Sequence, residues 1–468
     1  MPRKPPHAVC YNPRFCDKSS FFMFLGACGL TSLKRTIAFL VLGVWASFSL
    51  NGCSSSSSRP TVSGLHQRVL ASQGVTSPTT FGGLVFVNGL NDTIAPIAPL
   101  NAGSSPALEV VSPTRNILAA FDASSNNVFA VSTVTETGIG RVQLPGPTTS
   151  IVVPTANQIG YAAVPSAPVT GYPPGAVAVM NFASGSIATT IAVSNAQTVV
   201  SDSTGTQLLV FNSNSSLASD YISILTPANA VPPFDTSCYS APNSVCTVVH
   251  GFDQPVYAVI SGSTAYVLNC GPQCGGKQAS VAVFDLSSLT ITGTVPVDAA
   301  TWAFLNGSTL YVSGTSPSSL SNGCSGQKTA ATTCGRLDIV NVNSLTVTGS
   351  AVITDGYHDR MDMSANGQLF IGSFGCTSIG NVNNPSGEVR GCLSILNTNT
   401  GAVVIPPDNG DVTGLQGFTQ RNVEYVAENG VLRVYDTTKD ILLINDFLPQ
   451  GKINIVGSVG DVKAIDFF

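Results

Sequence analysis

Apolar and polar residues alternate along most of this chain in short runs that recur about every 45–55 residues. The clearest unit opens with PVYAVI (255–260), and a Ser-Gly-Ser-Thr turn separates it from AYVLN (265–269). The alternating run SVAVFD (280–285) follows after a loop, and then comes LTITGTVPV (289–297), which is rich in β-branched residues. Because alternation with period two and β-branched side chains suit pleated strands, each unit is predicted to hold four short strands.

Further copies keep the third run, which ends in Asn or Asp, and the β-branched fourth run; they lie at 177–191, 337–352, 393–405 and 432–444. Four short strands per repeat are typical of a propeller blade, so the sequence predicts an all-β fold, a single β-propeller over residues 81–468. First strands are expected near Ile117, Ile151, Thr198, Val256, Ala303, Met361, Leu415 and Ile453. This gives about eight four-stranded antiparallel blades. Seven is the alternative, because the units at 116–148 and 149–192 are degenerate.

The two ends of the domain each carry half a unit. Residues 84–88 and 93–97 resemble third and fourth strands without the first two, whereas 453–457 and 462–466 resemble first and second strands without partners. We therefore expect one closing blade shared by N-terminal and C-terminal strands, which removes the free sheet edges of an open ring.

The composition agrees with this fold, and the net charge excludes one class of binding partner. Only 10% of the residues are charged, while Gly, Ser, Thr, Val and Asn are abundant, as in a protein of strands and turns. Fourteen basic and 24 acidic residues follow Cys53, a net charge of −10. Nucleic acid is excluded as a partner, because its binding depends on basic patches.

The N-terminus carries a targeting pattern. Lys34 and Arg35 precede an apolar run at 36–50, too short to span a membrane but suited to a signal peptide, and the run ends in Leu-Asn-Gly before Cys53. This resembles the bacterial lipobox, which implies acylation of Cys53. Residues 1–33 stay unassigned, with Met23 as an alternative start; 34–52 are the predicted signal peptide and 53–80 a Ser-rich tether. The alternatives are an uncleaved anchor or an ordinary secretory signal.

The repeat units are similar to those of the YVTN-repeat family. The best matches are AYVLN (265–269), TLYVS (309–313) and SVAVFD (280–285), and the similarity spans about residues 82–468. The resemblance implies a propeller of the WD40-like superfamily, related to the propellers of quinoprotein amine dehydrogenases. Trp302 is the only Trp after the signal, whereas quinoprotein dehydrogenases have recurring Trp motifs, so no cofactor is predicted. We expect Trp302 to be wedged between blades.

Eight cysteines follow Cys53, and an even number in an exported chain indicates disulfides. Eight cysteines allow 105 connectivities, but the repeat places near neighbours in the same loops. Local pairing is therefore predicted: Cys238–Cys246, Cys270–Cys274, Cys324–Cys334 and Cys376–Cys392. The spacings match neither a zinc ribbon nor a haem attachment site, so no metal is predicted.

Candidate ligand-binding residues gather before the expected first strands, which line the channel of a propeller. The segment 355–362 is the richest: His358 titrates near neutral pH, Asp359 and Asp362 could orient it, and Arg360 could hold an anionic oxygen. Comparable positions in other blades are Arg115, Asp253 and Arg421. The alternative is structural: residues 358–360 form a turn between blades, and Asp362 binds backbone amides.

Two functions follow from these patterns. The first is a non-catalytic binding or scaffolding propeller on the bacterial cell envelope, anchored through a lipid in the outer membrane as Ser54 implies, with an envelope protein or glycan as partner. The second is a hydrolase or isomerase resembling lactonase-type propellers. We favour binding, because catalysis needs titratable residues from several blades and this chain has few.

Overall fold

The structure is a computed structural model that describes residues 63–75, 82–212, 219–317, 333–376, 391–406 and 410–466. The chain divides into two compact units, Met1–Ser58 and Arg59–Phe468, and all of the described residues belong to the second. The expected signal peptide and Cys53 lie outside the described residues. None of the described helices is long and apolar enough to cross a membrane.

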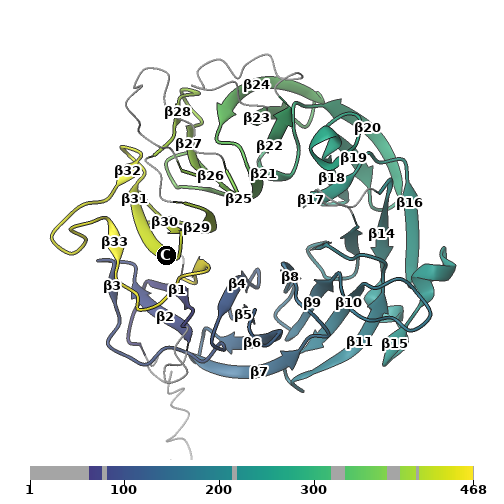
Figure 1. Cartoon of the computed structure of the whole chain (residues 1–468), viewed down its shortest axis with the longest axis horizontal. Helices are drawn as coiled ribbons and strands as arrows, with labels where there is room; N and C mark the ends of the chain where they lie inside the picture. Colours follow the sequence, from purple (N-terminus) through teal and green to yellow (C-terminus); the bar gives the residue numbers. More distant parts are fainter. Residues whose placement is uncertain are drawn as a thin grey trace, which may run out of the picture. The chain divides into compact units, whose positions relative to one another are not determined.

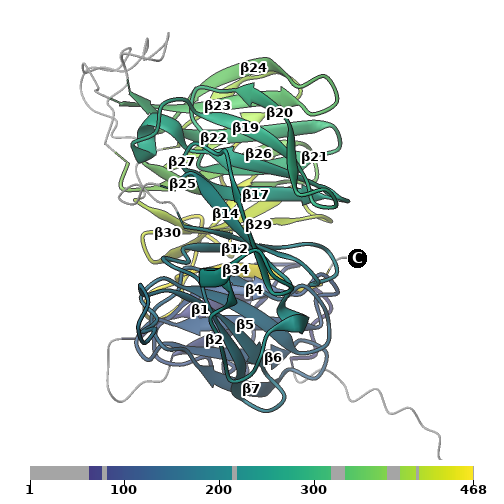
Figure 2. The same cartoon turned by 90° about the vertical axis from the view of Figure 1, so that its right-hand side faces the viewer.

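The second unit is an eight-bladed β-propeller, which confirms the predicted fold (Figure 1). The blades follow one another around a ring, and each is a sheet whose four strands pair antiparallel from the centre outward. Figure 2 shows the ring from its side. Both degenerate units form complete blades, so the count is eight rather than seven.

Blades 2 to 4 contain these strands, from the centre outward. Blade 2 has β4 (Pro106–Val111), β5 (Ile117–Asp122), β6 (Asn127–Ser132) and β7 (Thr137–Gln143). Blade 3 has β8 (Ser150–Val152), β9 (Ile159–Val164), β10 (Ala176–Asn181) and β11 (Ser186–Ala192). Blade 4 has β12 (Thr198–Ser201), β13 (Leu208–Phe211), β14 (Tyr221–Leu225) and β16 (Cys246–His250).

Blades 5 to 8 continue in the same order. Blade 5 has β17 (Pro255–Ser261), β18 (Thr264–Asn269), β19 (Ser280–Asp285) and β20 (Thr290–Pro296). Blade 6 has β21 (Trp302–Asn306), β22 (Thr309–Pro317), β23 (Thr333–Asn341) and β24 (Thr346–Ile353). Blade 7 has β25 (Tyr357–Met363), β26 (Gln368–Phe374), β27 (Leu393–Asn397) and β28 (Val403–Val404). Blade 8 has β29 (Val412–Phe418), β30 (Val423–Glu428), β31 (Val431–Asp436) and β32 (Ile441–Leu442).

Blade 1 closes the ring and joins the two ends of the chain, as predicted, but with a different division of strands. Its order from the centre is β34 (Val462–Ala464), β1 (Arg68–Gln73), β2 (Gly83–Asn88) and β3 (Thr93–Ile94). Three strands therefore come from the N-terminal end and one from the C-terminal end, instead of two from each. The second strand of this blade is β1, which lies in the stretch expected to be the tether. Its side chains are almost all buried, so this part of the stretch belongs to the propeller.

Two residues expected on first strands, Ile453 and Ile117, lie on other strands. β33 (Lys452–Ile453) pairs with β31 and extends the outer side of blade 8, so Ile453 is not at the channel. Ile117 begins the second strand of blade 2, whose first strand is β4. β4 contains a bulge between Pro106 and Leu108, which interrupts its period-two pattern.

The turn between the third and fourth strands explains the Asn or Asp that ends each third run. In blade 5, the Asp285 carboxylate accepts hydrogen bonds from the backbone N–H groups of Ser287 and Ser288, at 2.7 and 2.9 Å. Leu289, the fifth residue, adopts a left-handed conformation with φ of 54°. The same carboxylate or amide contact recurs in blades 6, 7 and 8 at Asn341, Asn397 and Asp436. Such side chains hold turns by binding the backbone two residues ahead.

Blade 4 replaces this turn with a long excursion. Between β14 and β16 the chain forms two short 3-10 helices, η1 (Pro227–Asn229) and η2 (Ser237–Ser240), and crosses to blade 3. There β15 (Phe234–Asp235) pairs in parallel with β11. The Cys238–Cys246 disulfide ties this excursion back to β16.

Three of the four predicted disulfides are present: Cys238–Cys246, Cys270–Cys274 and Cys376–Cys392. The second closes η3 (Gly271–Cys274), and both later pairs lie between second and third strands, as the repeat predicts. The fourth pair, Cys324–Cys334, falls on side chains outside the described part of the chain. It stays a prediction.

Candidate functional site

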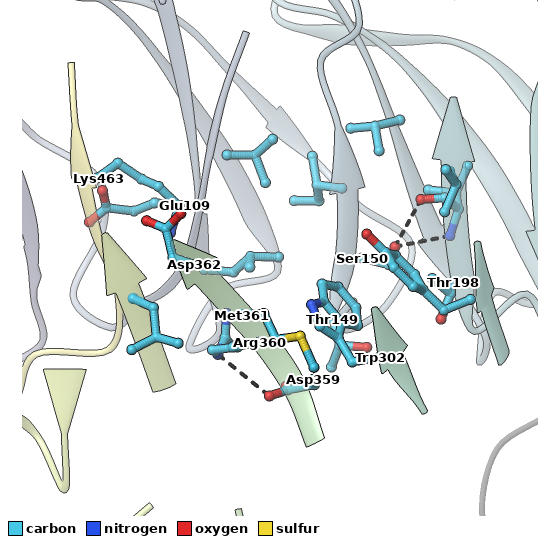
Figure 3. Close-up of a pocket in the computed structure, with 18 of the residues that line it drawn as sticks. Glu109, Thr149, Ser150, Thr198, Trp302, Asp359, Arg360, Met361, Asp362 and Lys463 are labelled. Atoms are coloured by element: carbon cyan, nitrogen blue, oxygen red, sulfur yellow. Dashed lines mark hydrogen bonds and ion pairs between the residues drawn. The ribbon is translucent and has the colours of Figure 1, made fainter. Parts of the chain in front are cut away.

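A cavity of about 470 Å³ lies where the innermost strands meet at the centre of the ring. All eight innermost strands contribute to its lining, from β4 round to β34. A second cavity of about 330 Å³ shares five lining residues with it: Thr149, Thr198, Tyr257, Trp302 and Asp359. The two volumes therefore form one channel site, which Figure 3 shows from close by.

An aromatic pair forms one wall of this site. The rings of Tyr257 on β17 and Trp302 on β21 are stacked, with centroids 3.8 Å apart and planes inclined by 15°. Both residues line both cavities. Desolvation raises the pKa of Tyr257 to about 12, so its phenol stays neutral. Trp302 is thus packed against the neighbouring blade, as expected, and also faces the channel.

A carboxylate and a guanidinium lie beside the aromatic pair. β25 has a bulge at Asp359, because His358 pairs with Ser373 and Arg360 with Gly372. Asp359 and Arg360 both line the larger cavity, and their closest charged atoms are 3.7 Å apart. That distance is an ion pair but too long for a hydrogen bond. Asp359 Oδ1 and Arg360 Nε are buried and have no hydrogen-bond partner among the described residues.

Burial also affects the protonation of this pair. Desolvation raises the pKa of Asp359, while the positive charge of Arg360 opposes the rise. The two side chains keep 29% and 23% of their surface exposed to the channel, so a ligand could reach them. Figure 3 shows them beside Trp302.

A second polar group lies at another part of the channel wall. Asp362 Oδ2 accepts a hydrogen bond from the Gly417 N–H at 2.6 Å, and Oδ1 accepts one from the Met363 N–H at 2.9 Å. Desolvation raises the pKa of Asp362, against these backbone hydrogen bonds. Asp362 therefore fastens blade 7 to blade 8, as the structural alternative for this residue predicted, while still lining the cavity.

Glu109 and Lys463 complete this polar group. Lys463 Nζ donates to Asp461 Oδ1 at 2.7 Å, and Asp461 Oδ2 accepts the Glu109 N–H at 2.8 Å. The carboxylate oxygens of Glu109 are buried, with no hydrogen-bond partner in the described part of the chain. Desolvation, and then the charge of Asp461, raise the pKa of Glu109 well above its ordinary value.

The structure brings four of the predicted site residues together: Arg115, Asp359, Arg360 and Asp362 all line the larger cavity. Arg115 donates to the backbone carbonyl of Ala464 in blade 1. Desolvation lowers its pKa to about 10, although Asp362 and Asp466 oppose the change. The guanidinium stays charged at neutral pH.

His358 does not line the channel, contrary to the expectation. It is fully buried, Nε2 donates to the backbone carbonyl of Thr354 at 2.9 Å, and Nδ1 has no partner among the described residues. Desolvation lowers its pKa to about 4. The bulge at Asp359 interrupts the alternation of side chains at this point of β25, so residues 359–362 all line the cavity while His358 is packed away from it.

Asp253 and Arg421 also lie outside the cavity lining. Asp253 accepts the backbone N–H groups of Lys277 and Gln278, both at 2.8 Å, and so holds the loop after η3. Arg421 pairs with the buried Asp92 of blade 1 at 2.8 Å. Both residues stabilise loops or contacts between blades.

Sequence reasoning missed Tyr257, Glu109 and Lys463, which line the cavity. Tyr257 stands in the first run of the clearest repeat, so its place on a first strand was a usable signal. Glu109 lies in the weakly patterned β4, and Lys463 was assigned to a second strand. Neither had a signal that pointed to the channel.

The site holds groups that can bind a ligand: an aromatic pair and several charged side chains line one cavity. Its charged groups flank an aromatic pair, and the one histidine of this segment is sequestered from them. Among the described residues, no three His, Cys, Asp or Glu side chains gather as a metal site. Recognition by stacking and hydrogen bonds is therefore the chemistry that this wall supports.

Comparisons with known proteins support the fold alone. No known protein family matches the chain, and no curated protein matches it. Among solved structures, the dihydro-heme d1 dehydrogenase NirN in complex with DHE aligns with a TM-score of 0.54 and 11% identity, over 84% of this chain and 74% of that one. The hydrazine synthase of Kuenenia stuttgartiensis aligns with a TM-score of 0.41 and 12% identity, over 72% and 77%.

Proposed function

We propose that this protein is a non-catalytic binding module whose propeller channel holds a small polar ligand. The observation that carries the proposal is the partly exposed pair Asp359 and Arg360 beside the Trp302 ring, in a cavity of about 470 Å³. Cavities of this size with an apolar wall and a few polar groups are typical of ligand sites. The exposed parts of these two charged side chains can form hydrogen bonds with a ligand in the cavity.

The alternative, a lactonase-like hydrolase, has less support. Such chemistry needs a base that is free to take a proton within hydrogen-bond reach of the substrate. His358 is buried away from the cavity, and Asp362 is engaged by two backbone N–H groups. Turnover of a lactone that Asp362→Asn abolishes would favour this second function.

We further propose that the module is a lipoprotein of the bacterial envelope, anchored through Cys53 and resembling YVTN-repeat propellers. The apolar run before Cys53 and the Ser-rich segment after it support this proposal. Palmitate labelling of the full chain in a bacterial host tests it: we expect labelling that Cys53→Ala removes. Labelling that survives the substitution would contradict the anchor.

The binding function is tested by thermal shift of the full chain in detergent. The ligands are panels of glycans, lactones, quinones and divalent metals. A ligand at 100 times its dissociation constant stabilises the folded state by about 2.7 kcal/mol, which is measurable. We expect at least one hit that Trp302→Leu weakens. If no ligand in any panel shifts the melting temperature, the result would count against a small-molecule site in the channel and favour a protein partner.

A further inference from the structure

We propose that the channel recognises a neutral pyranose sugar, with Trp302 beneath the sugar ring and Asp359 and Arg360 on two adjacent hydroxyls. This inference rests on the proposed binding function and names its ligand class. Three features of the channel wall carry it: the aromatic stack, the partly exposed carboxylate and guanidinium of Asp359 and Arg360, and the hydroxyl-bearing residues nearby.

The aromatic stack provides a rigid platform. Tyr257 covers one side of Trp302 at a centroid distance of 3.8 Å, which holds the indole in one orientation. The C–H face of a pyranose is apolar and slightly positive, so it complements the negative face of an aromatic ring. A preorganised ring loses little conformational entropy when a ligand packs against it. Trp302 suits a sugar ring that enters from the channel.

The exposed parts of the Asp359 and Arg360 side chains fit adjacent hydroxyls. Each sugar hydroxyl can donate one hydrogen bond and accept others, so one can donate to Asp359 while its neighbour accepts from Arg360. The 3.7 Å separation leaves both groups short of a hydrogen bond to each other. Because their charges cancel, the pair gives no advantage to a charged sugar. Hydrogen bonds to charged groups are also the stronger ones.

Hydroxyl side chains extend the polar surface of the same site. Thr149 and Thr198 line both cavities, and Thr149 is exposed to solvent. Ser150 is occupied: its hydroxyl accepts the Val199 N–H at 2.9 Å and so joins blades 3 and 4 (Figure 3). A flat apolar ligand would stack on Trp302 but cover the exposed parts of the charged Asp359 and Arg360 side chains without replacing their hydrogen bonds to water, which costs free energy. A sugar meets both requirements.

Trp302 fluorescence gives a direct test. The full chain contains two tryptophans, Trp45 and Trp302, so Trp45→Phe leaves a single reporter in the channel. We would titrate this protein in detergent with maltose, cellobiose, lactose and the disaccharide of N-acetylglucosamine. We expect saturable changes in emission with at least one of them. Asp359→Asn keeps the shape and removes the charged acceptor, and should weaken binding about tenfold or more.

Matched variants separate a ligand contact from a general loss of structure. Tyr172→Phe alters an exposed aromatic residue that stacks on Tyr239, outside the cavity lining, and should bind like the parent. Arg360→Gln should weaken binding as Asp359→Asn does, with an unchanged melting temperature. Equal binding by parent and Asp359→Asn would overturn the sugar geometry.

The outcomes also distinguish this inference from the function on which it rests. If no disaccharide changes Trp302 emission but another ligand class does so saturably, the sugar assignment is wrong and the binding function stands. If no ligand class changes the emission or the thermal stability, both fail.

Discussion

Arg68 and Asp466 form a two-pronged ion pair that joins the two ends of the propeller. Arg68 Nη2 lies 2.7 Å from Asp466 Oδ1, and Arg68 Nε lies 2.7 Å from Asp466 Oδ2. The second Nη of Arg68 donates to Glu136 in blade 2 at 2.8 Å. The hydrogen bonds that Arg68 donates to Asp466 are the main reason that the pKa of Arg68 is raised. One guanidinium thus links the start of β1, the end of β34 and the neighbouring blade.

Removal of this guanidinium should destabilise the propeller strongly. Arg68→Met leaves two buried carboxylates without their cation, and breaking a buried pair in this way costs about 3–5 kcal/mol. Urea unfolding followed by circular dichroism measures the loss. Arg141→Met, on the exposed surface of β7, is the control and should change the free energy of unfolding by less than about 0.5 kcal/mol. A loss that is no larger for Arg68→Met would refute this role.

The Cys238–Cys246 disulfide should stabilise the excursion that carries β15 to blade 3. By the chain-entropy model, closing a loop of this length contributes about 2–3 kcal/mol. The double variant Cys238→Ser, Cys246→Ser should lose about that much stability and exchange the backbone amides of β11 and β15 faster. Hydrogen exchange with mass spectrometry measures this. Unchanged exchange at β15 would show that its pairing does not depend on the disulfide.

The repeat was sufficient to predict the propeller because its signals are local. A third strand that ends in Asp285 or Asn341 must be followed by the same turn, since the side chain binds the next backbone N–H groups. The division of the closing blade was not predictable in this way. This division depends on the pairing of β1 with β34 and on the ion pair between Arg68 and Asp466, which join opposite ends of the domain. No short-range sequence pattern encodes such contacts.

The sequence predicted a channel residue correctly where its position relative to the first strand is enough to place it in the cavity wall. Asp359, Arg360 and Asp362 were predicted from their place next to the first strand expected near Met361. His358 required the exact register, because a shift of one residue moves a side chain from one face of a strand to the other. The bulge at Asp359 sets that register, and it arises from pairing with β26.

His358 should make stability depend on pH in the acid range. Its pKa is lowered from 6.5 to about 4 by burial, so the folded protein binds this proton less readily than the unfolded chain. Stability contributed by the neutral ring is therefore lost as pH falls from about 6.5 towards 4, by about 3 kcal/mol in total. His358→Gln should flatten this part of the curve of unfolding free energy against pH. The exposed His250→Gln is the control, and equal slopes in both variants would contradict the prediction.

Glu424 should produce a dependence of the opposite sign at higher pH. It lies on β30, fully buried, and neither carboxylate oxygen has a hydrogen-bond partner in the described ranges. Desolvation, and then the charge of Asp362, raise its pKa well above the ordinary value of 4.5, against the charge of Lys463. The folded state therefore keeps a proton that the unfolded chain releases, so stability falls as pH rises above 4.5.

Glu424→Gln replaces the protonated acid with a neutral group of similar shape and removes this titration. Its unfolding free energy should match that of the parent near pH 4. It should then exceed the parent's increasingly at higher pH, by up to about 1.4 kcal/mol per pH unit below the folded pKa. Urea unfolding at pH 4, 6 and 8 measures the difference, with the exposed Asp220→Asn as control. A constant difference across this range would mean that Glu424 is ionised in the folded protein, with Lys463 as its counter-charge.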